Sequence, residues 1–262
     1  MPFQVKNLVK RFGERTVLDG ISLTIPEGKT TVIMGGSGCG KSTLLRNLVG
    51  LLRPDEGEIW LEERNLAAIS EEEFNEVRKK FGMLFQGAAL FNSMTVGENV
   101  ALPMREHTDL SEEIIRIIVK IKLELVGLTG FEDFYPYQLS GGMKKRVGLA
   151  RAIALDPKIV FYDEPGAGLD PITASMIDQL ILDLSRKLQI TSVVVTHEMK
   201  SAFRIADWMV MLHRGKIVVQ GTPEEMRKAS NPYVRQFIHG EPEGAIPFRQ
   251  SSDAYLKGLL EP

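Results

Sequence analysis

Apolar and polar positions follow patterns that divide this chain into strands and helices. Over residues 3–33 the pattern predicts antiparallel strands separated by turns, with clean alternation over residues 21–25. An apolar, β-branched run at residues 31–34 predicts a buried strand. This strand leads directly into a run of glycines and then into a helical pattern over residues 41–48. The order of strand, glycine-rich loop and helix is therefore the first feature that organises the chain.

Three further apolar runs predict buried strands, and each of them ends at polar residues. The runs cover residues 81–86, 158–164 and 191–195, and the polar residues at their ends are Gln86, Asp163, Glu164 and His197. Open α/β sheets bind ligands at the carboxyl ends of their strands, so these side chains can face one site. Alone, Gln86 would be an ordinary solvated residue and His197 a structural one, so their shared position carries the argument.

The pattern becomes helical between residues 87 and 154. Apolar positions recur at helical spacing after Ser111, at Ile114, Ile115, Ile118, Ile121 and Leu125. Another helix is expected to begin after Ser140 and to run to about Leu155. We therefore expect a helical subdomain, at about residues 87–154, inserted into an α/β core.

The C-terminal part of the chain changes composition after two more strands and two short helices. We expect a strand pair at residues 208–212 and 216–219, and the last helix ends near residue 238. The segment 239–262 is rich in glycine and proline, with a short apolar patch at Tyr255, Leu256, Leu259 and Leu260. Such a segment is too short to fold alone. It is either a loose tail or an arm that docks on a partner, whereas residues 1–238 form the main domain.

The glycine-rich loop carries a phosphate-binding motif. Its fixed positions are Gly35, Gly40, Lys41 and Ser42, in the spacing G-x-x-x-x-G-K-S between a strand and a helix. The glycines allow backbone conformations that are closed to other residues, and successive N–H groups then point at an anion. Lys41 can reach the β- and γ-phosphates, and the Ser42 hydroxyl can ligate Mg²⁺.

Two other features suit phosphate chemistry. Adjacent carboxylates at the end of a buried strand are costly without a metal or a proton partner. Asp163 suits a Mg²⁺ ligand, and Glu164 suits the base that orients and polarises the attacking water. Ser140 precedes Gly141 and Gly142 at a helix start, which makes a second site that favours an anion. A helix N-cap would explain Ser140 but not the two glycines.

Bulk composition limits the class of protein. The chain has 262 residues, a formal net charge of −2 and one cysteine, Cys39. The absence of a basic excess disfavours extended contact with nucleic acid, and one cysteine excludes an internal disulfide. We expect no signal peptide, since the N-terminus lacks an apolar core. No apolar run approaches the roughly 18 residues that span a bilayer, so work at a membrane would require another chain as the anchor.

These motifs occur together in the order typical of the ATP-binding-cassette family, which the sequence resembles over residues 1–238. The resemblance implies an α/β P-loop NTPase core with an N-terminal antiparallel β subdomain and an inserted helical subdomain. It implies ATP as the substrate and Mg²⁺ as the cofactor. The ATP-binding residues it indicates are Phe12, which stacks on adenine, and Gly35, Gly36, Ser37, Gly38, Cys39, Gly40, Lys41, Ser42 and Thr43. Without that resemblance, Phe12 would be an ordinary, partly exposed strand aromatic.

The same resemblance implies further roles and a dimer. Gln86 senses the metal and the water and links to a membrane partner, Asp163 and Glu164 end the Walker B strand, and His197 contacts the γ-phosphate. The signature residues Ser140, Gly141 and Gly142 bind the ATP held by a second copy, and Asp170 closes the D-loop beside them. The implied assembly is a head-to-tail dimer with two nucleotides between its subunits.

A narrower resemblance depends on secondary motifs. The signature ends in Met143 where most cassettes have Gln, and residues 86–91, 103–108, 234–237 and 247–249 have the sequences QGAALF, PMREHT, VRQF and PFR. Together they resemble the ATPase subunit of the bacterial MCE-type phospholipid transporters, the Mla system. That family implies lipid transport between inner and outer membranes through a separate permease, with an MCE-domain lipid-binding subunit. It implies a peripheral position on the cytoplasmic face of the inner membrane, and an arm that contacts the other subunit.

Three interpretations stay open from the sequence. The segment Leu90–Met104 either forms, with Gln86, a groove for the permease or belongs to the core of the helical subdomain. The chain could instead power another importer, for amino acids or metal chelates, although Met143, residues 105–108 and the arm argue against this. A soluble cassette acting on DNA or ribosomes is disfavoured by the near-neutral charge and by the single cassette in the chain.

Overall fold

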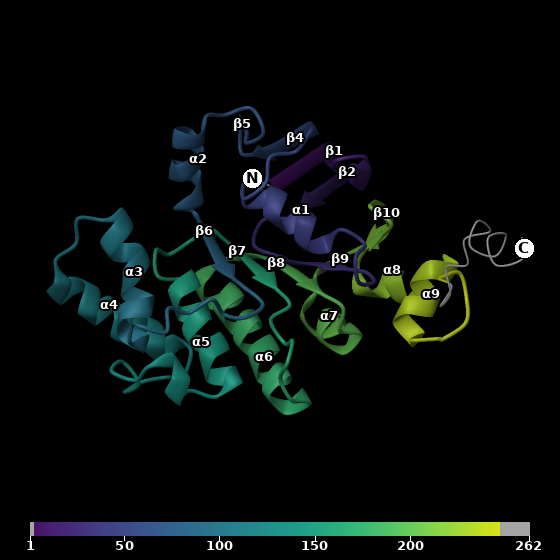
Figure 1. The fold of residues 1–262 in the computed structure, drawn as a ribbon. Coiled ribbons are helices and arrows are strands. Elements are labelled where there is room, and N and C mark those ends of the chain that lie inside the picture. The colour runs from purple at the N-terminus through teal and green to yellow at the C-terminus, as the bar shows by residue number, and fades with distance from the viewer. Residues whose placement is uncertain (1–2, 247–262) are drawn as a thin grey trace, which may run out of the picture.

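The computed structural model describes residues 3–246, and its strands form two sheets that pack on each other (Figure 1). Within this range the strands are β1 (Phe3–Phe12), β2 (Arg15–Ile25), β3 (Thr30–Met34), β4 (Glu56–Leu61), β5 (Arg64–Asn65), β6 (Phe81–Leu84), β7 (Ile159–Asp163), β8 (Thr191–Thr196), β9 (Trp208–His213) and β10 (Lys216–Gly221). The smaller sheet has the order β2-β1-β4-β5, and the larger has the order β10-β9-β3-β8-β7-β6.

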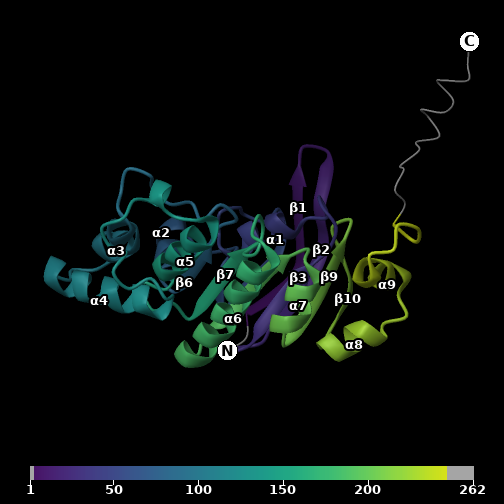
Figure 2. The ribbon, with the colours of Figure 1, turned by 90° about the horizontal axis from the view of Figure 1, so that it is seen from below.

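The helices lie around and beside the larger sheet (Figures 1 and 2). They are α1 (Lys41–Leu48), α2 (Glu71–Arg78), α3 (Val96–His107), α4 (Glu112–Leu125), α5 (Gly141–Ala152), α6 (Pro171–Leu188), α7 (Met199–Ile205), α8 (Pro223–Lys228) and α9 (Pro232–His239), with a 3₁₀ turn at Pro136–Gln138. In residues 3–246 no helix is long and apolar enough to cross a membrane.

Strand β3 lies inside the larger sheet and pairs in parallel with both β8 and β9. The prediction that residues 3–33 are antiparallel throughout is therefore wrong for this strand, whereas β1 and β2 do pair antiparallel. The physical reason is burial on both faces. Every residue of β3 is buried, with Val32 in one apolar core and Ile33 in the other. A strand covered on both faces lacks the alternation of an antiparallel strand with one solvated face.

The parallel pairing brings the ends of four strands to one edge of the larger sheet. In register, Met34 of β3 lies beside Thr196 of β8, and Asp163 of β7 lies beside Val195 of β8. Strand β6 joins this set by pairing with β7. The phosphate loop, Gln86, the acidic pair and His197 follow these strand ends directly. The sheet thus brings four separated segments of the chain to one place.

Helices begin where the sequence provides capping side chains. Ser70 and Glu73 form a capping box at α2, and Thr95 and Glu98 form another at α3. Ser111 caps α4, which begins at Glu112, in agreement with the helical pattern predicted after Ser111. Helix α5 ends at Ala152, three residues before the expected Leu155. Its last turns pack against β6, where a side chain at Gly82 would lie 2.3 Å from the Ala152 carbonyl oxygen.

Helices α3, α4 and α5 occupy the segment where the sequence predicted a helical subdomain at residues 87–154, and they lie together at one end of the molecule (Figure 1). At the other end, α9 stops at Gly240 in the left-handed conformation. The buried Gln236 amide then bonds to the backbone of Glu241 and Ile246. Most of the proposed C-terminal arm, including its apolar patch, lies outside the described residues.

Phe161 connects the two sheets, and this contact generates a stability prediction. Its buried ring meets Phe81 edge-on at 5.3 Å between centroids and Phe3 of the smaller sheet at 6.3 Å. We expect Phe161→Ala to lower the free energy of unfolding by about 3–5 kcal/mol, since it leaves a cavity in this core. Ile117→Ala, at an exposed site on α4, should change it by less than about 0.5 kcal/mol. Equal urea midpoints for the two variants would contradict this account.

Candidate functional site

The loop between β3 and α1 is built around glycines that no other residue could replace. Gly35 has φ 152°, and a Cβ there would lie 2.2 Å from the carbonyl oxygen of Leu212. Gly40 has φ 109°, and a Cβ there would meet Leu18 at 2.8 Å and the Val17 carbonyl oxygen at 3.0 Å. Steric exclusion therefore explains the glycines at these two positions of the motif. The backbone can approach a ligand closely because no side chain intervenes.

Lys41 is the first residue of α1, and its ammonium group folds back over the loop. Its Nζ donates hydrogen bonds to the carbonyl oxygens of Gly35 at 2.8 Å and Gly36 at 3.0 Å. The side chain is buried. A phosphate oxygen is a stronger acceptor than a neutral carbonyl because it is charged. The loop thus presents a positive charge, a helix N-terminus and free backbone N–H groups to an anion.

Two oxygen groups suited to magnesium lie close together between α1 and β7. The Ser42 hydroxyl is 3.5 Å from an Asp163 carboxylate oxygen. Burial, followed by the adjacent Glu164 charge, raises the pKa of Asp163. A cation would relieve both effects. Within residues 3–246 there is no cluster of three or more His, Cys, Asp or Glu side chains that could hold a metal. Two protein oxygens nevertheless suit Mg²⁺, which is commonly held by one or two protein ligands, substrate phosphates and water.

Glu164 is the carboxylate best arranged for proton transfer. It is buried, and its Oε1 lies 2.9 Å from His197 Nδ1, whereas Oε2 is buried without a hydrogen-bond partner. Its backbone has φ 48°, an uncommon value for a residue with a side chain, and its N–H donates to the Val195 carbonyl oxygen at 2.9 Å. An unpartnered buried carboxylate oxygen is costly, and it can accept a proton from a water that enters the site with the ligand.

Lys145 of α5 belongs to this region but was not identified from the sequence. It is 5% exposed, and its Nζ donates to the carbonyl oxygens of Gln86 and Glu164, the latter at 3.2 Å. Burial lowers the pKa of Lys145, while the charges of Asp163 and Glu164 oppose this shift. A sequence signal did exist, since Lys145 precedes the buried residues Leu149 and Ala152 at helical spacing. A lysine on an apolar helix face indicates a buried partner.

The signature residues begin α5, and their hydrogen bonds in the structure are local. The Ser140 hydroxyl caps the helix by accepting from the Met143 N–H. A Cβ at Gly142 would lie 2.5 Å from Thr173 Cγ2, so this glycine permits close packing of α5 on α6. Gly141 is exposed at the helix start, whereas Gly142 is buried. The role of Ser140, Gly141 and Gly142 toward a second copy stays a prediction.

Asp170 and Phe12, two further residues predicted from the sequence, make local contacts in the structure. Asp170 caps α6 by accepting from the Ile172 and Thr173 N–H groups, and the Thr173 hydroxyl and backbone N–H hold its pKa below the usual range. Phe12 ends β1 with 49% of its surface exposed, and the Lys10 ammonium lies 5.6 Å from its ring. An exposed ring is available for stacking, and its contact with adenine stays a prediction.

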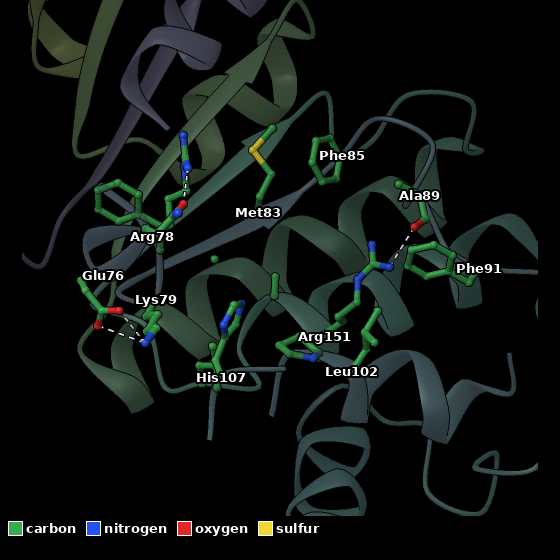
Figure 3. Close-up of a pocket in the computed structure, with 16 residues that line it drawn as sticks. Glu76, Arg78, Lys79, Met83, Phe85, Ala89, Phe91, Leu102, His107 and Arg151 are labelled. Carbon is green, nitrogen blue, oxygen red and sulfur yellow. Dashed lines mark hydrogen bonds and ion pairs between the residues drawn. The ribbon is translucent and has the colours of Figure 1, made fainter. Parts of the chain in front are cut away.

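A groove of about 830 Å³ lies between α2, β6, α3 and α5 (Figure 3). Its lining includes Phe85, Phe91, Leu102, His107 and Arg151. From the sequence, the segment 90–104 is expected either to form a groove or to belong to the core of the helical subdomain, and in the structure it does both. One set of its side chains lines the groove, and another set belongs to the core, namely Val96, Val100, Ala101 and Met104. The groove adjoins Gln86 through Phe85.

Known proteins resemble this chain in sequence over most of their lengths. The sequence profile described as ABC transporter matches residues 18–167. The intermembrane phospholipid transport system ATP-binding protein MlaF of Haemophilus influenzae is 44% identical over 258 residues, 98% of each chain. MlaF of Escherichia coli K12 is 46% identical over 248 residues, 95% of this chain and 92% of that protein. A probable ribonucleotide transport ATP-binding protein, mkl, of Mycobacterium tuberculosis is 44% identical, covering 95% of this chain and 70% of the relative.

Solved structures agree with the fold. A dimeric ATP-binding cassette in a post-hydrolysis state, bound to ADP and phosphate, aligns with a TM-score of 0.77 at 33% identity, covering 84% of this chain and 98% of that one. A component of the cbiONQ ABC transporter complex of Clostridium perfringens aligns with a TM-score of 0.79 at 31% identity, covering 86% and 93%. With its phosphate loop, acidic pair and signature helix in the arrangement described above, the chain belongs to the ABC transporter family and has the fold of its ATPase cassette.

Proposed function

We propose that this chain is the ATP-hydrolysing subunit of a bacterial phospholipid transporter, working on the cytoplasmic face of the inner membrane beside a separate permease. The observation that carries the hydrolytic part is the buried Glu164 carboxylate, with one oxygen on His197 and the other without a partner. The phospholipid part is supported by the likeness to MlaF over nearly the whole chain.

The chain's own groups account for binding of the triphosphate. The loop N–H groups and Lys41 hold the phosphates, and the exposed Phe12 ring stacks on the base. Ser42 and Asp163 would hold Mg²⁺, with Gln86 nearby at the end of β6. When bound, the ion neutralises charge on the phosphates. Catalysis of phosphoryl transfer is largely positioning and charge stabilisation, which fixed loops at a sheet edge can provide.

Glu164 is assigned the role of base toward the attacking water. Its unpartnered oxygen can accept the proton, while the His197 contact holds the other oxygen in place. The left-handed backbone at Glu164 stores strain that the hydrogen bond to Val195 helps to maintain. His197 itself is largely exposed, with 59% of its side-chain surface accessible, so it is also free to meet the γ-phosphate.

A second copy is assigned to complete each nucleotide site. Ser140, Gly141 and Gly142 begin a helix whose first N–H groups favour an anion, and Asp170 orders the start of the neighbouring α6. The similar cassettes in the solved structures are described as dimeric. The proposed working form is therefore a head-to-tail dimer that closes on two ATP molecules and opens after hydrolysis.

The groove beside α3 and α5 is assigned to a cytoplasmic helix of the permease (Figure 3). Aromatic and aliphatic groups line it together with charged side chains such as Lys79 and Arg151, and Phe91 is half exposed. Apolar helix faces bind in grooves of this kind. An MCE-domain lipid-binding subunit is the further partner implied for such a transporter, and the segment 239–262 is assigned to contact the second copy. No nucleic-acid partner is proposed.

Glu164→Gln should bind ATP with near-normal affinity and lower turnover by roughly 10²–10⁴-fold, since the amide cannot accept a proton from water. The variant should accumulate as an ATP-bound dimer on size-exclusion chromatography. Turnover close to that of the unmodified protein would contradict the assignment of Glu164 as the base.

Lys41→Ala should weaken ATP binding by at least about tenfold because a charged hydrogen-bond donor to phosphate is lost. The measurement is equilibrium binding of a fluorescent ATP analogue. The control is Lys187→Ala, at an exposed position near the end of α6, which should bind as the unmodified protein does. Unchanged binding in Lys41→Ala would argue against the phosphate site.

Affinity purification from detergent-solubilised membranes tests the transport assignment. The tagged chain should retain a permease, an MCE-domain protein and phospholipid. Leu102→Glu, which introduces a charge at an apolar position of the groove, should lose the permease, whereas Ile117→Glu on the exposed face of α4 should retain it. Recovery of a solute-binding protein or of ribonucleotides in place of lipid would overturn the phospholipid assignment.

A further inference from the structure

Helix α5 contacts two loops of the site through basic side chains that point away from solvent. The Lys145 ammonium bonds to the carbonyl oxygens of Gln86 and Glu164. These carbonyls belong to segments that are 78 positions apart by residue number (164 − 86) and that follow neighbouring strands, β6 and β7. A single side chain therefore connects the loop after β6 to the residue assigned as the base.

The loop after β6 is held in an unusual conformation by the same helix. Ala88 and Ala89 have consecutive positive φ values of 61° and 49°, which are disfavoured for residues with a side chain. The Arg151 guanidinium donates to the Ala89 carbonyl oxygen at 2.8 Å (Figure 3) and to that of Ala88 at 2.7 Å. Gly148 allows the close packing, because a Cβ there would lie 3.2 Å from the Ala88 side chain.

This loop is also part of the groove wall. Phe85, Ala89 and Arg151 all line the groove assigned to the permease, and Figure 3 shows the Arg151 guanidinium directed at the Ala89 carbonyl. Any change in the groove that moves the loop after β6 must move the Gln86 carbonyl. Because Lys145 bonds to both the Gln86 and the Glu164 carbonyl oxygens, it offers a route by which such a displacement can reach the backbone of Glu164.

We propose that Lys145 is a positioning residue for ATP hydrolysis, which fixes the Glu164 backbone relative to the loop at Gln86 and so makes the Glu164 carboxylate responsive to the permease groove. The inference rests on the proposed function, because it requires Glu164 to act as the base. Lys145 itself touches two backbone carbonyls and has no assigned contact with ATP.

Burial makes the contact strong enough for this role. Lys145 is 5% exposed and its bond to the Glu164 carbonyl is buried, so that carbonyl would lose its partner with little access to water if the ammonium were removed. The ammonium also offsets the charges of two adjacent acids. A small rotation of a residue that bears the catalytic base can lower a rate by about a hundredfold, since the reacting atoms must meet in a narrow geometry.

Lys122 of α4 provides a matched control. It is also 5% exposed and lies on a helix of the same region, but its Nζ contacts the Asp156 carboxylate, and neither residue has a role assigned at the nucleotide site. Lys145→Met and Lys122→Met each remove one buried ammonium group, although the partner of Lys122 is an exposed carboxylate. If buried lysines matter only for packing, the two substitutions should have the same effect on turnover.

The experiment measures ATPase kinetics and thermal unfolding of the full chain with these variants. We expect Lys145→Met to lower kcat by about 10- to 100-fold with KM for ATP changed less than about threefold, and Lys145→Arg to recover most of the loss. Lys122→Met should keep the kcat of the unmodified protein. In the Glu164→Gln background, Lys145→Met should cause no further loss, because both changes act on the same group.

Several results would overturn the proposal. These are a kcat for Lys145→Met equal to that of Lys122→Met, a loss confined to KM, or losses that multiply in the Glu164→Gln background. If Lys145→Met fails to fold, Lys145→Gln provides the same comparison with a smaller change in polarity. If the unmodified protein hydrolyses ATP and Lys145→Met has the same kcat, only this inference is refuted. An unmodified protein that binds ATP without hydrolysing it refutes the proposed function and this inference together.

Discussion

The site depends on one constraint, the parallel pairing of β3, β8, β7 and β6. Parallel strands in register end at the same edge, so whatever follows each strand must meet there. Burial on both faces keeps this register, since a slip of one residue would move Val32 and Ile33 into each other's core. The phosphate loop, the acidic pair and His197 are close in space for this reason alone.

The charged side chains at that edge of the sheet have few partners of opposite charge within the described part of the protein. The acidic side chains are adjacent and largely buried, and two buried basic groups of the site, Lys41 and Lys145, bond to backbone carbonyls. Such an arrangement is costly for the isolated chain. It suits a ligand that brings both negative phosphate and a cation, since binding would then satisfy groups that the protein leaves incompletely paired.

Helix α5 connects the signature residues, the acidic pair and the groove. Its first residues are the signature, its second turn carries Lys145, and its fourth carries Arg151 beside the groove. A helix is a stiff element, so a displacement at one end is transmitted to the other. The two basic side chains bond α5 to the loop after β6 at two points, which joins the groove to the acidic pair.

Local chemistry in the sequence determined the phosphate loop, the acidic pair, most strand and helix positions, and the family. Those features depend on residue types at short spacing, such as Gly35 to Ser42. Patterns of this kind can be recognised from the sequence without knowledge of the fold. Tertiary structure decided that β3 joins the parallel sheet, that the segment 90–104 divides between groove and core, and that Lys145 reaches the carbonyls of Gln86 and Glu164. These facts depend on which distant segments pack together. The role of the buried Lys145 ammonium can be inferred only when its hydrogen-bond partners are known.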